Sequence, residues 1–187
     1  MIKVYLKVPS KNDLHFRQEW MNDSKTMNYN AGFDMNLKGY DKKTGTILKT
    51  NEEMIDWYNK WINKEPDRYF AYIYVDGIEE PIGEVYYYPE DDIHSRGILV
   101  VDKYRGKGYS YSALMELEKV AFEKNNINEL SDMVPLDRVG AIKTFKKAGF
   151  IHTNKEVIEK VFDKESTIRQ LLITKDMYYN KKESGNY

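Results

Sequence analysis

Alternating apolar and polar positions, together with short apolar runs, predict seven strands along the chain. A period of two is typical of strands, and glycine or aspartate between two such segments indicates a turn. Asp76-Gly77 has this chemistry and predicts a hairpin between the second and third segments. The predicted strands cover residues 2–8, 69–75, 81–88, 94–101, 129–134, 156–162 and 167–179.

Apolar positions spaced three or four residues apart predict four helices. Asp13 is the expected N-cap of the first helix. Thr50 and Glu53 form a capping-box pattern before the second, and Gly149 follows the fourth, where a helix C-terminus favours glycine. The predicted helices cover residues 13–22, 51–62, 108–124 and 139–148.

The predicted elements follow one another as βααβββαβαββ. One mixed, twisted sheet with helices on both faces buries these patterns. We therefore expect an α+β fold, an α/β/α sandwich, in a single domain over residues 1–180 with a frayed tail at 181–187. Residues 23–49 are polar and contain three glycines. A loop of this length is usually functional or mobile.

Composition narrows the class of protein. The net charge of the 187 residues is −1, which gives no general attraction to nucleic acid or to an anionic membrane. The absence of cysteine excludes disulfides, thiolate metal sites and a cysteine nucleophile, and no metal site is expected. No apolar run approaches the roughly 20 residues of a membrane span, and the N-terminus lacks a signal-peptide pattern. We therefore expect a cytoplasmic protein.

The most specific pattern is the turn Arg105-Gly106-Lys107-Gly108, which joins an apolar strand to a helix. Glycines bring successive N–H groups together and let a ligand approach, and the helix start adds free N–H groups and a positive dipole end. With two basic side chains the turn suits a phosphate or pyrophosphate. The alternative is a plain strand–helix turn with solvated basic side chains. Gly108 after the lysine excludes a P-loop, and Tyr111 excludes a dinucleotide fingerprint.

Two motifs in this order resemble the GNAT superfamily of acetyl-CoA-dependent N-acetyltransferases. They are "ILVVDKYRGKGYSYSALMELEKVAF" at residues 98–122 and "GAIKTFKKAGF" at residues 140–150. The family loop, Arg/Gln-x-x-Gly-x-Gly/Ala, is matched by residues 105–110 with Ser110 in the last place. The resemblance is strong over residues 69–150. It is weaker over the first 65, where Trp20-Met21-Asn22-Asp23 is similar to ribosomal-protein, polyamine and some aminoglycoside acetyltransferases.

The resemblance implies the GNAT fold, with a sheet splayed at one strand, and acetyl-CoA as cosubstrate. In the family the loop N–H groups bind the pyrophosphate and the preceding strand pairs with the pantetheine arm. A backbone N–H of that strand, here of Val100 or Val101, binds the acyl oxygen. The residues implied at the acetyl-CoA site are Ile98, Leu99, Val100, Val101, Arg105, Gly106, Lys107, Gly108, Tyr109, Ser110 and Phe145. Phe145 stands where many members have a tyrosine that protonates the leaving thiolate, so that role has no residue here.

Two residues are candidates for the base that takes the proton of the attacking amine. Family members often have a carboxylate eleven residues before the loop's Arg or Gln, where this sequence has His94. Histidine is mostly neutral at pH 7, and Asp92 is near enough in sequence to orient it. Glu84 is the other candidate, since a charge among apolar strand neighbours either faces solvent or points into the cleft. By alternation His94 and Arg96 share a face, from which Arg96 is either solvated or binds an acceptor carboxylate.

The acceptor is expected to be a primary amine that attacks acetyl-CoA directly. Glu90, Asp91 and Asp92 follow three tyrosines and suit a cationic amine, or form a solvated loop. A polyamine or aminoglycoside-like amine is favoured over a protein N-terminus, and the resemblance allows a homodimer. The rival function is a non-catalytic acyl-CoA-binding module, which Phe145 and the non-carboxylate His94 favour. The loop 27–49, with Tyr29, Phe33, Met35 and Tyr40, is expected to cover the acceptor side or to be disordered.

Overall fold

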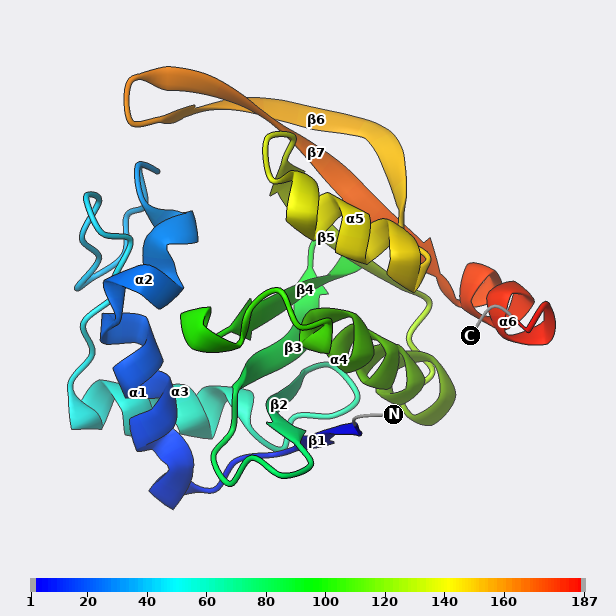
Figure 1. Ribbon diagram of the computed structural model, residues 1–187, viewed down its shortest axis with the longest axis horizontal. Helices are drawn as coiled ribbons and strands as arrows, with labels where there is room; N and C mark the ends of the chain where they lie inside the picture. The colour runs from blue at the N-terminus through cyan, green and yellow to red at the C-terminus, as the bar shows by residue number, and fades with distance from the viewer. Residues whose placement is uncertain (1–2, 186–187) are drawn as a thin grey trace.

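Seven strands form one mixed sheet in the order β1-β2-β3-β4-β5-β7-β6 in the computed structural model, which describes residues 3–185 (Figure 1). Neighbouring strands are antiparallel except β4 and β5, which are parallel. The predicted turn at Asp76-Gly77 lies between β2 and β3. The strands are β1 (Val4–Lys7), β2 (Tyr69–Val75), β3 (Gly83–Glu90), β4 (Ile93–Val100), β5 (Glu129–Pro135), β6 (Ile151–Val161) and β7 (Lys164–Thr174).

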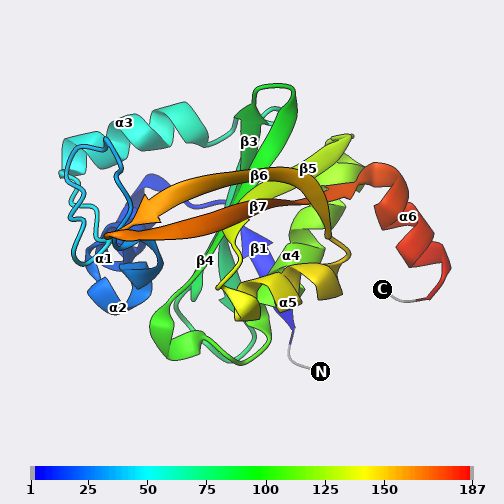
Figure 2. The same ribbon diagram turned by 90° about the horizontal axis from the view of Figure 1, so that it is seen from above.

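Helices cover both faces of the sheet (Figure 2). On one face lie α1 (Leu14–Asn22), the short α2 (Ser24–Met27) and α3 (Asn51–Trp61). On the other lie α4 (Tyr109–Glu118), which continues as the π-helical η4 (Lys119–Lys124), and α5 (Val139–Ala148). A last helix, α6 (Lys175–Glu183), follows β7. Within the described residues no helix combines the length and the apolar character that a membrane crossing requires.

Side chains of the central strands alternate between two hydrophobic cores. On β2, Phe70 and Tyr72 face the first helices, where Tyr72 meets Trp20 at 5.1 Å between ring centroids. Ala71 and Ile73 face α4 and α5 instead. Because both faces of the sheet are covered, a strand here is apolar at successive positions. This explains why residues 69–75 form a continuous apolar run.

One local prediction was wrong at an element end, and another is confirmed in position only. Asp13 is the N-cap residue of α1, as predicted, but its side chain bonds no amide of that helix. Its carboxylate instead accepts a hydrogen bond from the amide of Ser10, the N-cap residue of the preceding 3-10 turn, at 2.8 Å. The strand expected over 167–179 ends at Thr174, whose hydroxyl caps α6. Residues 181–183 of the expected frayed tail belong to α6, which ends at Glu183, and Lys181 Nζ donates to Ala148 O at 2.9 Å. The end of that tail, residues 186–187, lies outside the described residues.

The long polar segment after α1 is partly ordered by contacts with the opposite end of the chain. After α2 it continues as a 3-10 turn at Asn28–Asn30. The turn between β6 and β7 reaches this segment (Figure 1), and Phe162 N–H donates to Gly32 O at 2.7 Å. A Cβ on Gly32 would lie 2.5 Å from the Phe162 ring, so glycine permits this close approach.

Strands β4 and β5 are paired only where they begin. Their Cα partners are His94 with Leu130 and Ser95 with Ser131. Beyond these pairs β4 continues along β3, while β5 continues along β7. The sheet therefore opens in a V, with residues 96–100 of β4 along one arm.

Candidate active site

The gap between β4 and β5 contains a cavity of about 620 Å³. Its lining comes from both arms of the V, from α4 and α5, and from the segment after α2. The structure thus brings together most of the residues predicted for acetyl-CoA, while Val101, Lys107, Gly108 and Tyr109 lie outside the lining. The predicted residues that line the cavity are Ile98, Leu99, Val100, Arg105, Gly106, Ser110 and Phe145.

Peptide groups of β4 point alternately toward β3 and toward the cavity. Val101 N–H donates to Ile82 O at 2.9 Å, so it is not free to bind an acyl oxygen. Hydrogen-bonded and non-hydrogen-bonded pairs alternate along an antiparallel ladder, and every second peptide group of β4 therefore turns toward the cavity. The residues with such peptide groups are Arg96, Ile98 and Val100.

The glycine turn lies at the open end of the cavity, and its geometry fits a phosphate. Gly106 and Gly108 have φ of 76° and 81°, a conformation that favours glycine, and a Cβ on either would meet no atom within 4 Å. Gly108 immediately precedes α4, so the first N–H groups of that helix face the same open space. Within the described part of the chain the amides of residues 106–108 donate to no backbone group. Free donors and the positive helix end suit a pyrophosphate.

The side chain of Arg105 bonds to carbonyl oxygens of the chain, whereas the sequence suggested a contact with phosphate. Its Nε donates to Val100 O at 2.9 Å, and Nη1 and Nη2 donate to the carbonyl oxygens of Lys25 and Thr26. These bonds tie the end of β4 to α2, so the guanidinium is already occupied. The basic side chain that remains beside the turn is Lys107, whose Nζ lies 5.6 Å from the Tyr104 ring centroid.

Arg96 is buried at the point where β4 and β5 part. Its side chain is 0% exposed, Nη2 donates to Asp132 Oδ2 on β5 at 2.9 Å, and Cζ lies 3.5 Å from the Phe145 ring centroid. Nε and Nη1 have no hydrogen-bond partner among the described residues. Burial lowers the pKa of Arg96 to about 10, which leaves it cationic at neutral pH. Arg96 is therefore not solvated. The other expectation was that it binds the carboxylate of an acceptor, and the carboxylate that it contacts here is that of Asp132.

Tyr29 and Tyr86 line the cavity on the side of the first helices. The Tyr86 ring covers Gly97, where a Cβ would lie 2.3 Å from Tyr86 Cζ. Arg138, at the start of α5, donates to Tyr29 O and lies 5.6 Å from the ring centroids of both Tyr29 and Phe33. The beginning of the predicted covering loop therefore lies at the cavity, whereas Met35 and Tyr40 line a separate surface pocket.

Glu84 is buried next to these tyrosines. It is 3% exposed, and its Oε2 lies 3.0 Å from Arg17 Nε of α1. Burial raises the pKa of Glu84, and the positive charge of Arg17 partly offsets this. The carboxylate charge in turn helps to raise the pKa values of Tyr29 and Tyr86, for which burial is the larger cause. Glu84 itself, like His94, is not among the residues that line the cavity. A buried carboxylate with a raised pKa is nevertheless suited to act as a base.

His94 lies at the closed end of the V, outside the cavity lining. Its ring meets the Tyr87 ring edge-on at 5.6 Å between centroids. Burial lowers the pKa of His94, and the charges that act on it are those of Asp67 and Glu129 rather than Asp92. The predicted orienting role of Asp92 is thus not seen.

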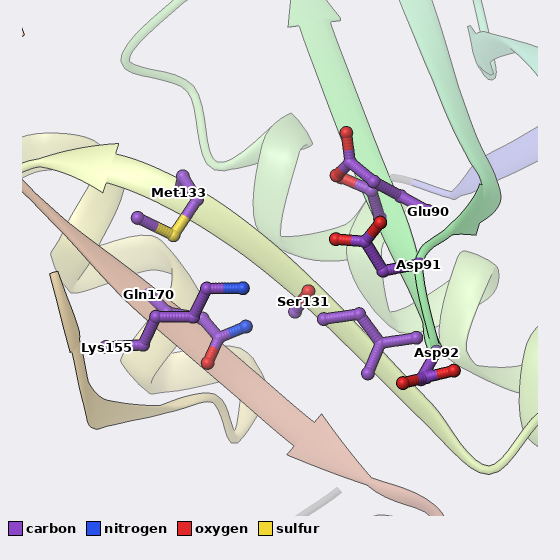
Figure 3. A pocket seen from close by; sticks show the side chains of 9 residues that line it. Glu90, Asp91, Asp92, Ser131, Met133, Lys155 and Gln170 are labelled. Carbon is purple, nitrogen blue, oxygen red and sulfur yellow. The ribbon is translucent and has the colours of Figure 1, made fainter. Parts of the chain in front are cut away.

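A second, acidic pocket of about 400 Å³ adjoins the cavity, and the two share Ser95 and Met133. The carboxylates of the β3–β4 turn lie on one side of it, and Lys155 and Gln170 from β6 and β7 lie on the other (Figure 3). Three carboxylates against one ammonium make the pocket attractive to cations. The acidic residues are Glu90, Asp91 and Asp92.

The comparison with known families decides the assignment. The sequence profile of the acetyltransferase (GNAT) family matches residues 37–150. The chain belongs to the GNAT acetyltransferase family. No curated protein sequence matches this GNAT chain.

Solved structures share the fold of this acetyltransferase at low sequence identity. The spermidine N-acetyltransferase from Vibrio cholerae in complex with CoA and spermine has a TM-score of 0.75 at 16% identity, over 95% of this chain and 98% of that chain. A chimera of that enzyme with hSSAT has a TM-score of 0.72 at 15% identity, over 95% and 98% of the two chains. An acetyltransferase of the GNAT family from Bacillus anthracis has a TM-score of 0.69 at 13% identity, over 93% and 96%.

These comparisons confirm the family resemblance, the fold and the cosubstrate. GNAT acetyltransferases use acetyl-CoA, and the protein is an acyl-CoA-dependent acetyltransferase. In this GNAT chain the turn has amides that donate to no backbone group within the described residues, and every second peptide group of β4 faces the cavity.

Two charged residues that line the cavity of this acetyltransferase were missed at the level of sequence. Asp132 is a charged residue in the short predicted strand at 129–134, and the argument applied to Glu84 would have selected it. Arg138 carries no such signal, because its contact with Tyr29 joins segments more than 100 residues apart.

Proposed function

We propose that this acetyltransferase transfers the acetyl group of acetyl-CoA to a primary amine of a linear polyamine. The observation that carries the substrate class is the junction of the cavity and the acidic pocket at Ser95 and Met133. A polyamine whose reacting nitrogen lies at β4 extends its next ammonium group toward three carboxylates. The fold shared with a spermidine N-acetyltransferase bound to spermine supports this choice.

The acetyl donor is held by backbone groups. With its pyrophosphate at residues 106–110, the pantetheine arm runs along β4 toward the apex of the V and passes Val100 first. Because the arm is several bonds long, the thioester lies deeper than Val100, beside Ile98, whose N–H also faces the cavity. We assign the acyl oxygen to the N–H of Ile98, two residues from the predicted Val100, since a fixed donor stabilises the charge that develops there.

The amine attacks without a covalent acyl-enzyme. Its nitrogen bonds to the carbonyl carbon, the carbon–sulfur bond breaks with its electron pair on sulfur, and a proton leaves the nitrogen. We assign that proton to Glu84, which lies on the acceptor face behind Tyr29 and Tyr86 and has its pKa raised by burial. His94 remains the competing candidate, and both residues lie outside the cavity lining.

Thiol release from acetyl-CoA with a panel of amines tests the proposal. Spermidine and spermine should release free thiol at the highest kcat/KM, followed by short diamines and then monoamines. Highest activity with an aminoglycoside or a peptide N-terminus would overturn the substrate class. Tight acetyl-CoA binding without thiol release from any amine would overturn the reaction and favour the binding module that Phe145 suggested.

Removal of negative charge from the acidic pocket tests the proposed contact between its carboxylates and a second ammonium group of the polyamine. Glu90→Gln together with Asp91→Asn keeps the size of both side chains, and asparagine tolerates the positive φ of 52° at position 91. We expect KM for spermine to rise about 10-fold, roughly the loss of one exposed charge contact per carboxylate. KM for a monoamine and the Kd for acetyl-CoA should not change, because neither reaches the pocket.

A further inference from the structure

Residues 25–33 form a bridging segment whose beginning is fixed to the β4 arm of the V. The Thr26 side chain is fully buried, and its Oγ1 accepts a hydrogen bond from Asp102 N–H, two residues after β4, at 3.1 Å. Arg105 Nη1 and Nη2 donate to the carbonyl oxygens of Lys25 and Thr26 at 3.3 and 2.5 Å. These hydrogen bonds hold the start of the bridging segment in place relative to β4.

Arg138, at the start of α5, fixes the bridging segment to the other arm. Its Nη2 donates to Tyr29 O, and its Cζ lies 5.6 Å from the ring centroids of both Tyr29 and Phe33. Helix α5 and β5 contribute to the core on one face of the sheet, whereas Tyr29 packs against the core on the opposite face. The Arg138 side chain therefore joins the two faces across the gap between β4 and β5.

The contacts of Arg138 are of a kind that fixes a side chain firmly. A hydrogen bond from a charged donor is stronger than one between neutral groups, and a guanidinium over an aromatic ring adds a favourable electrostatic contact. Burial lowers the pKa of Arg138, and the charges of Asp137 and Asp132 partly offset this. Because Asp132 is paired with Arg96, the carbonyl oxygen of Tyr29 and the two rings are the groups that orient Arg138.

Tyr29 is the residue through which this contact reaches the cavity. Its side chain lines the cavity together with Tyr86, on the side of the first helices, where we place the acceptor amine. A further hydrogen bond to the second arm, from Phe162 N–H to Gly32 O at 2.7 Å, lies three residues beyond Tyr29. Arg138 is thus the group of the second arm that contacts Tyr29 directly, and its loss leaves the position of Tyr29 to more distant contacts.

We propose that Arg138 is a positioning residue for the acceptor: it holds Tyr29 in the cavity wall and so sets the width of the cavity on the acceptor side. This role rests on the proposed acetyl transfer to an amine. Arg138 acts through Tyr29, and the donor is proposed to bind backbone groups of the turn and of β4. Loss of Arg138 should therefore weaken binding of the amine and leave the affinity for acetyl-CoA and the rate at saturating amine nearly unchanged.

Steady-state kinetics with the best amine of the panel separate these quantities. Arg138→Met removes the donors and the charge and keeps an unbranched side chain. We expect KM for the amine to rise about 10-fold, the usual effect of losing a hydrogen bond from a charged group, with kcat and the Kd for acetyl-CoA within about 3-fold of the wild type. A Kd for acetyl-CoA that rises as much as KM, or more, would overturn this role and place Arg138 at the donor. An unchanged KM would overturn it as well.

Lys143→Met is the matched control. Lys143 is exposed on the same helix, and its replacement removes one positive charge from α5 while the contact with Tyr29 stays in place. KM for the amine, kcat and the Kd for acetyl-CoA should all keep their wild-type values. An equal rise of KM in Lys143→Met and Arg138→Met would attribute the effect to the general charge of α5 and overturn the role of Arg138.

A variant of Phe33 tests the contact from the side of the bridging segment. Phe33→Leu keeps an apolar side chain and removes one of the two rings beside Arg138. We expect it to raise KM for the amine in the wild-type background and to have little further effect in Arg138→Met, since both changes break the same contact. Additive effects would show that the two residues act independently and would overturn the assignment.

Hydrogen exchange reports the position of the bridging segment without any amine. The amides of Ala31 and Gly32 each donate to a backbone carbonyl oxygen. They should exchange about 10-fold faster in Arg138→Met and at the wild-type rate in Lys143→Met, because local opening becomes easier where a contact is lost. Wild-type exchange in folded Arg138→Met would overturn the hold of Arg138 on this segment. Faster exchange, with no amine acetylated by the wild type, would leave that hold intact and overturn the proposed function alone.

Folding is checked in the same samples by circular dichroism. Arg138→Lys keeps the charge and loses the forked donor group, so its KM for the amine and its exchange rates should lie between those of the wild type and Arg138→Met. If Arg138→Met does not fold, Arg138→Lys and Phe33→Leu decide the question. Wild-type KM and wild-type exchange in both of these variants would overturn the proposal.

Discussion

Glu84 and His94 lie on adjacent central strands, but only Glu84 adjoins the tyrosines of the cavity wall. A base must be deprotonated to act, and burial holds the pKa of Glu84 above that of a free glutamate. Activity should therefore rise with pH through this raised pKa and level off above it. We expect Glu84→Gln to lower kcat/KM by ~10²–10⁴ and to remove this acid-side limb.

The comparison between two variants decides which residue is the base. His94→Ala is measured over the same pH range, and the variant with the larger loss of kcat/KM and the altered limb identifies the proton acceptor. Glutamine keeps the size of Glu84 beside Arg17, and thermal melting checks that the α1–β3 contact survives. Near-normal rates in both variants would contradict both assignments and point to an amine that arrives neutral.

Some of these roles are visible in the sequence and others are not. The charge of Glu84 among apolar neighbours marked it as unusual, and the alternation of β4 correctly put Arg96 on the face of His94. The partner of Arg96 was not predictable, because Asp132 lies 36 residues away and meets it only where β4 and β5 begin to part. Elements that are distant in sequence bury Arg96, and this burial distinguishes it from a solvated arginine.

At the scale of elements, the glycine turn before α4 is the clearest case for a local test. Gly108 has φ of 81°, and a Cβ there would enter open space rather than protein. Gly108→Val should weaken acetyl-CoA binding by at least ~2 kcal/mol, through lost backbone contacts to charged phosphate. Calorimetry on the folded variant measures this loss.

Gly77 offers a matched control for backbone strain. Its φ is 83°, and its Cβ would also meet nothing within 4 Å, but it lies in the β2–β3 connection away from the cavity. Gly77→Val should lower the free energy of unfolding about as much as Gly108→Val and leave acetyl-CoA affinity unchanged. Equal affinities in the two variants would show that the turn at 108 has only a structural role.

Periodicity predicted the elements well where one pattern dominates and poorly where two patterns overlap. Residues 69–75 and 139–148 have the predicted bounds. The strand predicted over 167–179 continued past Lys175, but Thr174 caps a helix there. The end of β7 is therefore determined by hydrogen bonding rather than by hydrophobicity. The parting of β4 from β5 left no mark in periodicity, since apolar residues continue along both strands beyond the last pair, Ser95 with Ser131. Only the resemblance to the GNAT motifs indicated it.

At the scale of the whole molecule, the sheet consists of two parts joined by two residue pairs. One part contains β1 to β4, and the other contains β5, β7 and β6. Acetyl-CoA bound along β4, as proposed, would add contacts across the gap and should stabilise the fold. At 100 times its Kd, coenzyme A should add about 2.7 kcal/mol to the free energy of unfolding, or roughly 5–11 °C in Tm for a domain of this size.

Hydrogen exchange followed by NMR checks where that stabilisation arises. Coenzyme A should slow exchange at the amides of Ile98 and Val100, which face the cavity, and should change Leu99 and Val101 less, since those face β3. Uniform protection along β4 would contradict the alternation and the pairing of the pantetheine arm with this strand.

The contact between Gly32 and Phe162 has a consequence for the order in which the site is assembled during synthesis. The turn proposed to hold the pyrophosphate and the strand before it have been synthesised once residue 110 has left the ribosome. The bond from Phe162 N–H to Gly32 O joins a segment made early to one made 130 residues later, and β7, which must pair between β5 and β6, is made later still. A nascent chain can therefore contain the complete glycine turn well before the segment around Gly32 can make its contact with Phe162.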